Sequence, residues 1–116
     1  LIRNNELEEM RMEQIKSAEK FQEIIGQDGR NVVIFTTTWC PDCKRLDMFI
    51  DGIVEDNKDK NWYVIDKDEF PEIAEEQNVR GIPSLLVYNK GEKLAHLHSA
   101  NAKTEDQVRE FIQQLP

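Results

Sequence analysis

The stretch Trp39-Cys40-Pro41-Asp42-Cys43 contains the only two cysteines among 116 residues, and they stand three positions apart. The run before it, residues 32–38 (VVIFTTT), is apolar and β-branched, which predicts a buried strand. The run after it, residues 44–54, carries apolar side chains at helical spacing. The cysteine pair therefore lies where a strand passes into a helix, and a proline at position 41 suits the first turn of that helix.

A cysteine pair at a helix N-terminus is suited to disulfide exchange. The thiolate is the attacking species, and the free backbone N–H groups at a helix N-terminus favour a negative charge. We expect Cys40, at the exposed start of the turn, to attack, and Cys43, one turn further on, to resolve the mixed disulfide. The carboxylate of Asp42 opposes a second negative charge, so we expect moderate activation of Cys40, which suits a reductant more than a strong oxidant.

Two other kinds of site also use a Cys-x-x-Cys pair. A structural zinc site needs four ligands, and the chain has no second cysteine pair. His96 and His98 alternate on an expected strand and can face one side, but nothing places that side near Cys40. A structural disulfide usually closes a longer loop, because a two-residue loop restrains little of the unfolded chain. Redox chemistry is the favoured interpretation, with no metal and no bound cofactor.

Length and composition limit the class of protein. A chain of 116 residues with 39% hydrophobic content predicts one domain with a modest core. We assign that domain to residues 11–116 and interpret residues 1–10 as an N-terminal extension or leftover expression sequence. The net charge of −8, from 23 acidic and 15 basic residues, disfavours nucleic-acid binding, for which a basic patch is typical.

The cellular location follows from hydropathy and cysteine usage. No apolar run approaches the roughly 20 residues of a membrane-spanning helix, and no signal-peptide core is visible. Two cysteines in one Cys-x-x-Cys pair are more typical of a reducing compartment than of a secreted domain. We expect a monomeric cytoplasmic protein without membrane contact; because residue 1 is Leu, an upstream export signal would overturn this expectation.

The remaining patterns predict an alternation of strands and helices. Strands are expected at residues 11–16, 62–66, 84–88 and 93–98, and helices at residues 18–27, 41 to about 55, from 71 to before 79, and from 105. Ser17 and Thr104 are the expected N-caps, and residues 89–92 form a turn. On the last strand, Leu94 is expected on one face, with Ala95 and Leu97 on the other.

Strands separated by helices favour parallel pairing, and the hairpin adds an antiparallel edge. The result is an α/β fold, a small mixed β-sheet with helices on both faces.

Three motifs together carry a family resemblance: Trp-Cys-x-x-Cys-Lys at residues 39–44, Val-Arg-Gly-Ile-Pro at 79–83 and Asn-x-Gly at 89–91. Without the other two motifs, Pro83 would be expected to be a trans proline that begins a strand. The combination resembles the thioredoxin family over residues 11–115. The resemblance implies the thioredoxin fold, a cis Pro83 that lies against the cysteines and excludes metal, and an Ile82 backbone that pairs with the substrate chain.

The resemblance also implies an activity, which is the reduction of protein disulfides. Residues Trp39, Pro41, Asp42, Ile82 and Pro83 would bind the disulfide-containing protein substrate. Electrons would come from a thiol reductase or a low-molecular-weight thiol. Two alternatives remain: a thiol oxidant or isomerase in an oxidising compartment, and a non-catalytic adaptor that binds partners through the same groove.

The chain departs from the family pattern at several positions. Pro41-Asp42 replaces Gly-Pro, as in thioredoxin-related proteins with narrower substrate sets. Ile34 and Trp62 replace a buried Asp and Lys, so the usual base for Cys43 is missing, and we hypothesise that water or Asp42 substitutes. The family has a Trp where this chain has Thr36, and a helix-kinking Pro where it has Met48. The family's groove-lining Gly corresponds to Ser99 or a neighbouring residue. Without the proline, we expect a straighter helix after the cysteines.

Overall fold

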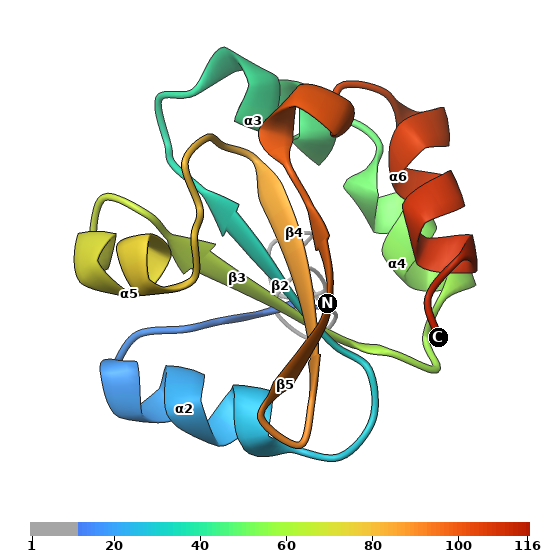
Figure 1. Ribbon diagram of the computed structural model, residues 1–116. Helices are drawn as coiled ribbons and strands as arrows, with labels where there is room; N and C mark the ends of the chain where they lie inside the picture. The colour runs from blue at the N-terminus through green and yellow to red at the C-terminus, as the bar shows by residue number, and fades with distance from the viewer. Residues whose placement is uncertain (1–11) are drawn as a thin grey trace, which may run out of the picture.

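The computed structural model describes residues 12–116 and gives a five-stranded sheet flanked by helices (Figure 1). The predicted extension, residues 1–10, lies outside the described residues. The elements in chain order are β1 (Met12–Gln14), α2 (Ala18–Gly26), β2 (Asn31–Thr36), α3 (Pro41–Asp47), α4 (Ile50–Asp56), β3 (Asn61–Asp66), α5 (Pro71–Glu76), β4 (Ser84–Asn89), β5 (Glu92–Leu97), the 3-10 turn η1 (Ser99–Asn101) and α6 (Glu105–Gln113). The α/β class with a small mixed β-sheet is confirmed.

The strands lie in the order β1-β3-β2-β4-β5. The first three are parallel, whereas β4 is antiparallel to β2 and β5 is antiparallel to β4. Parallel pairing was wrong for β4, because the helix between β3 and β4 does not run back along the length of the sheet. Helix α5 has six residues, a length of about 9 Å, whereas a six-residue strand spans roughly 20 Å. The chain therefore enters β4 at the end of the sheet where β3 finished, with Ser84 beside Phe35.

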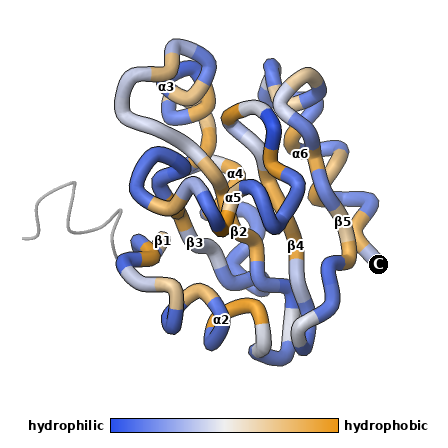
Figure 2. The backbone as a smooth tube through the Cα atoms, turned by 60° about the vertical axis from the view of Figure 1, so that its left-hand side comes forward, coloured by the Kyte–Doolittle hydropathy of each residue, from blue (hydrophilic) through white to orange (hydrophobic). Residues whose placement is uncertain are grey.

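Two apolar clusters lie on opposite faces of the sheet. Helices α2 and α5 cover one face, and α4 and α6 cover the other (Figure 1). Strand β2 serves both faces by alternation, since Val33 and Phe35 join the α2–α5 cluster while Val32 and Ile34 join the α4–α6 cluster. Figure 2 shows hydrophobic residues along β2 and β4, and the mixed colouring of α2 fits its single buried face. The predicted cover of both faces by helices is confirmed.

Local capping signals were predicted correctly. The side chain of Ser17 accepts a hydrogen bond from the backbone of Lys20 at 3.1 Å and so begins α2. Thr104 and Gln107 form a reciprocal capping box that begins α6. The β4–β5 turn has positive φ at Lys90 and at Gly91.

The predicted straight helix after the cysteines was wrong, because the chain breaks between α3 and α4. The backbone N–H groups of Met48 and Phe49 bond three residues back, at 3.1 and 3.0 Å, and this replaces α-helical bonding by a tighter turn. Phe49 then takes φ −130°, outside the helical region. The break directs Phe49 toward the α4–α6 cluster and leaves Met48 85% exposed, so a helix can bend here without proline.

The predicted alternation on β5 was also wrong at Leu94. Val87 pairs with Ala95 and Tyr88 pairs with Lys93, so Leu94 is an extra residue in a β-bulge. Leu94, Ala95 and Leu97 consequently all pack against the α4–α6 cluster.

Candidate active site

Cys40 and Cys43 meet at the junction of β2 and α3, as the sequence predicted. Cys40 is the N-cap of α3, and its Sγ accepts a hydrogen bond from the backbone N–H of Cys43 at 3.2 Å. Pro41 occupies the first turn, and both cysteines are free thiols. The two sulfur-bearing residues are therefore held on one helical turn, the arrangement needed for an internal disulfide.

Cys40 is less exposed than its place at the start of the turn suggested. Its residue is 6% exposed and Cys43 is 1% exposed. The Sγ of Cys40 lies 3.8 Å from the carbonyl oxygen of Ile82, to which the thiol donates. The loop before β4 thus covers this sulfur, which the sequence position of Cys40 could not indicate.

The peptide bond between Ile82 and Pro83 is cis. The conformation implied by the family resemblance is confirmed, and the interpretation of Pro83 as a trans residue is wrong. The Oγ of Ser84 donates to the carbonyl oxygen of Gly81 at 2.6 Å and holds the loop at the start of β4. Ile82, 42 residues beyond Cys40, is thereby brought to the sulfur.

Cys43 has a thiol that is hard to ionise. Burial, and then its hydrogen bond with Cys40, raise the pKa of Cys43 to about 11. Hydrogen bonds from the side chain of Thr36 and the backbone of Thr37 lower the pKa of Cys43 but do not offset the burial. Ile34 and Trp62, at the positions where the resemblance implies a buried Asp and Lys, both lie in the α4–α6 apolar cluster.

Asp42 is paired with two cations, a contact that no pattern in the sequence indicated. Its Oδ2 accepts a hydrogen bond from Lys103 Nζ at 2.6 Å, and its Oδ1 lies 3.5 Å from Arg45 Nη1. The hydrogen bond from Lys103 is the main reason that the pKa of Asp42 is lowered. An ionised, paired carboxylate is a weak base, which counts against the hypothesis that Asp42 deprotonates Cys43.

Trp39 lies beside the cysteines with 62% of its surface exposed, which leaves it accessible to a substrate chain. Its Nε1 donates to Asp68 Oδ2 at 2.6 Å, and the backbone N–H of Asp68 donates to Asp66 Oδ1 at 2.8 Å. The loop after β3 therefore fixes the indole over the surface. No local pattern indicates this contact, because 29 residues separate its partners.

His96 lies on β5, and His98 directly follows the end of that strand. The rings of His96 and His98 stack with centroids 3.8 Å apart, so both face one side, as alternation predicted. In the part of the chain that the structure describes, no group of three or more His, Cys, Asp or Glu residues is arranged to hold a metal ion.

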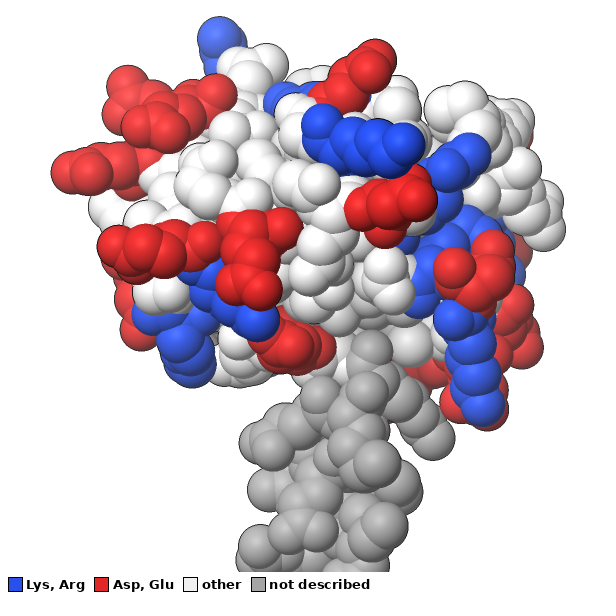
Figure 3. All heavy atoms as spheres, turned by 90° about the horizontal axis from the view of Figure 1, so that it is seen from below, with Lys and Arg blue, Asp and Glu red and all other residues white. Residues whose placement is uncertain are grey.

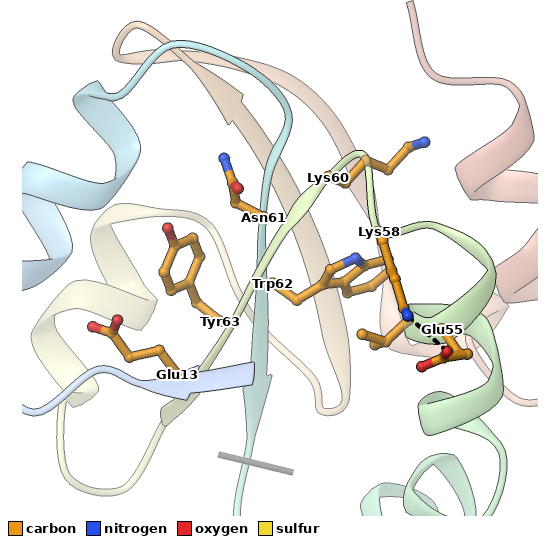
Figure 4. Close-up of a pocket in the computed structure, with 8 residues that line it drawn as sticks. Glu13, Glu55, Lys58, Lys60, Asn61, Trp62 and Tyr63 are labelled. Carbon is orange, nitrogen blue, oxygen red and sulfur yellow. Dashed lines mark ion pairs between the residues drawn. The ribbon is translucent and has the colours of Figure 1, made fainter. Parts of the chain in front are cut away.

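A hollow of about 390 Å³ lies at the start of β3, where Trp62 and Tyr63 point to opposite sides of the strand (Figure 4). An ion pair between Lys58 and Glu55, 2.8 Å long, crosses its rim. The hollow lies at the N-terminal end of β3, whereas Cys40 follows the C-terminal end of the parallel strand β2. The hollow is therefore separate from the redox pair.

Charge is mixed on the molecular face that carries α2. Acidic and basic side chains alternate there, and the view of this face contains no broad basic area (Figure 3). Among residues 12–116, no helix combines the length and the apolar character needed to cross a membrane.

The chain was compared with known proteins. The family model described as Thioredoxin matches residues 12–114. Thioredoxin-1 of Saccharomyces cerevisiae is 34% identical over 88 residues, which is 76% of this chain and 85% of the relative. Thioredoxin of Callithrix jacchus is 30% identical over 104 residues, covering 87% of this chain and 99% of the relative.

Solved structures confirm the predicted thioredoxin fold. The crystal structure of thioredoxin from Trypanosoma brucei brucei matches with a TM-score of 0.77 and 25% identity, covering 89% of this chain and 92% of that one. The thioredoxin of Malassezia sympodialis matches with a TM-score of 0.78 and 26% identity, covering 88% of each chain.

Proposed function

The chain belongs to the thioredoxin family and is a thiol–disulfide oxidoreductase that reduces protein disulfides, and from this premise we propose that Cys40 is the attacking thiol and Cys43 the resolving thiol. The observation that carries the assignment is the geometry of the pair. Cys40 Sγ already accepts a hydrogen bond from the helix backbone at 3.2 Å, which favours its anionic form, whereas Cys43 is buried with a pKa raised to about 11.

The exchange proceeds in two steps. The Cys40 thiolate attacks one sulfur of the substrate disulfide, the substrate S–S bond breaks, and the leaving sulfur takes up a proton. The Cys43 thiolate then attacks Cys40 Sγ, and a Cys40–Cys43 disulfide forms as the second substrate thiol leaves. The protein loses two electrons, and the substrate disulfide gains them and becomes a dithiol.

Substrate binding is assigned to the surface around Cys40. The backbone of Ile82 next to cis Pro83, with its carbonyl oxygen 3.8 Å from Cys40 Sγ, would pair with the chain that carries the disulfide. The exposed indole of Trp39, together with Pro41 and Asp42, would complete the docking surface.

The partner and location assignments are also proposals. A thiol reductase or a low-molecular-weight thiol would return the disulfide to the dithiol, with no bound cofactor. We place the protein in the cytoplasm as a monomer with one domain over residues 11–116. One relative is named as a mitochondrial thioredoxin, so cell fractionation has to distinguish these two compartments.

Insulin reduction tests the assignment of the two thiols. Wild-type protein with dithiothreitol should precipitate the insulin B chain, and Cys40→Ser should abolish this catalysis. Cys43→Ser should instead form a mixed disulfide with the substrate through Cys40, visible by mass spectrometry. Full activity in Cys40→Ser would contradict the assignment. A wild type that binds partners but never reduces insulin would favour the adaptor alternative.

A further inference from the structure

Lys103 contacts the redox motif from a distant part of the chain. Its Nζ donates to Asp42 Oδ2 at 2.6 Å, although 61 residues separate the two. Asp42 stands between the two cysteines in the first turn of α3. An ionised carboxylate at this position opposes any second negative charge, and a Cys40 thiolate is such a charge.

The backbone around Lys103 is anchored by the capping box of α6. Gln107 Oε1 accepts hydrogen bonds from the backbone N–H of Lys103 at 2.8 Å and of Thr104 at 3.0 Å. On the other side, Ala102 is buried in the α4–α6 cluster. In Figure 1 the orange-red segment that precedes α6 lies beside α3. Because its backbone is already ordered, Lys103 has less freedom to lose when it binds Asp42.

Arg45 is the competing cation, and its contact with Asp42 is weaker. The distance to Asp42 is 3.5 Å for Arg45 and 2.6 Å for Lys103, and the Arg45 side chain is 60% exposed against 40% for Lys103. An exposed side chain on the same helix is better screened by water than one that reaches across from an anchored loop. Lys103 is therefore the principal counter-charge of Asp42.

We propose that Lys103 is a positioning residue of the redox site, which binds the Asp42 carboxylate and thereby allows the Cys40 thiolate to form beside it. The residue acts through Asp42 and touches neither sulfur in this account. The proposal rests on the proposed function, because only an attacking Cys40 requires a thiolate.

The test is a double-mutant cycle read by alkylation of Cys40. Lys103→Met, Asp42→Asn and the double variant are made in a Cys43→Ser background, and the rate of reaction with iodoacetamide is followed from pH 5 to 9. Alkylation reports the thiolate without any substrate, so it is independent of disulfide reduction. At pH 7, Lys103→Met should react about 1.4- to 5-fold more slowly, the range expected for a partly exposed charge pair.

The remaining variants separate a charge effect from a structural one. Lys103→Arg should react like the parent, and Asp42→Asn should react at least as fast. The double variant should match Asp42→Asn, because Lys103 has no carboxylate left to bind. Lys90→Met, in the hairpin turn at the far end of β4, is the matched control and should leave the rate unchanged.

Two outcomes would overturn the inference. One is an alkylation rate that Lys103→Met leaves unchanged. The other is a loss of rate on Lys103→Met that is the same with and without Asp42→Asn. Insulin reduction by the wild type is measured separately. If it fails while the alkylation cycle behaves as expected, the proposed function is wrong, and only the electrostatic coupling of Lys103 to Cys40 through Asp42 is supported. If insulin is reduced while the cycle shows no coupling, only the role of Lys103 is wrong.

Discussion

At the scale of single residues, the balance of charge around the two thiols decides the chemistry. Cys43 must become a thiolate to resolve the mixed disulfide, yet burial raises its pKa to about 11. Ile34 stands where the family has a buried Asp, and it lies in the α4–α6 apolar cluster. The groups that favour the Cys43 thiolate are the Thr36 side chain and the Thr37 backbone.

Replacing Thr36 by Val should therefore slow the resolving step. The side-chain hydrogen bond from Thr36 lowers the pKa of Cys43, so its removal should raise that pKa further and reduce the rate at neutral pH about two- to tenfold. The measurement is the release of substrate from a preformed mixed disulfide at several pH values. Thr38→Val, at the exposed neighbouring position, is the control. Equal release rates for both variants would exclude a role for the Thr36 hydroxyl.

Sequence reasoning at this scale succeeded where the signal is local. The cysteine pair and the caps at Ser17 and Thr104 each depend on neighbours within one helical turn. The contacts of Asp42 with Lys103 and of Trp39 with Asp68 were missed, because 61 and 29 residues separate their partners. Burial of Cys40 was missed for the same reason, since the covering loop lies 42 residues away.

At the scale of elements, the segment of residues 99–103 joins the two sides of the site. Lys103 at one end binds Asp42 of α3, and Ser99 at the other end lies against Gly81 of the loop before β4. A Cβ at Gly81 would fall 3.1 Å from Ser99 Cβ and closer still to its Oγ. The segment thus sets the distance between the redox helix and the cis-proline loop.

Gly81→Ala should disturb this spacing. The added methyl group collides with Ser99, and overpacking of this kind costs about 1–3 kcal/mol, so the melting temperature and insulin reduction should both fall. A second change, Ser99→Gly, removes the colliding atoms and should restore most of the loss. Gly26→Ala is the matched control, because nothing lies within 4 Å of its added Cβ. A Gly81→Ala variant as stable and active as the wild type would show that the contact is not tight.

The errors of prediction at this scale have physical causes beyond local pattern. The apolar spacing of residues 44–54 fits one continuous helix, but bonds from Met48 and Phe49 to residues three positions back end α3 early. The direction of β4 depends on the path of the whole β3–β4 connection, in which helix α5 has only six residues. The side-chain positions on β5 depend on a β-bulge at Leu94, and the sequence on either side of Leu94 does not indicate this bulge.

At the scale of the whole molecule, stability should depend on His96 in mildly acidic solution. Burial first, and then the charges of His98 and Lys93, lower the pKa of His96 from 6.5 to about 4. The folded protein keeps His96 neutral, whereas the unfolded chain takes up a proton below pH 6.5. The contribution of His96 to the free energy of unfolding is therefore present above pH 6.5 and is lost as the pH falls toward 4.

His96→Gln should make this pH dependence shallower. Chemical unfolding between pH 7 and 4.5 measures the slope, which should fall by up to about one bound proton per molecule. His98→Gln, which keeps the half-buried ring of His96, should retain more of the slope. The same slope in His96→Gln and in the wild type would mean that His96 is protonated equally in both states.

The direction of electron flow is the central claim about the whole protein, and the reduction potential tests it most directly. The protein is equilibrated with dithiothreitol redox buffers, and the fluorescence of Trp39 beside Cys40 is followed. A reductant should give one reversible two-electron transition near about −270 mV, the known value for thioredoxin. A potential near about −120 to −180 mV, where the known oxidants and isomerases lie, would contradict the assignment as a reductant.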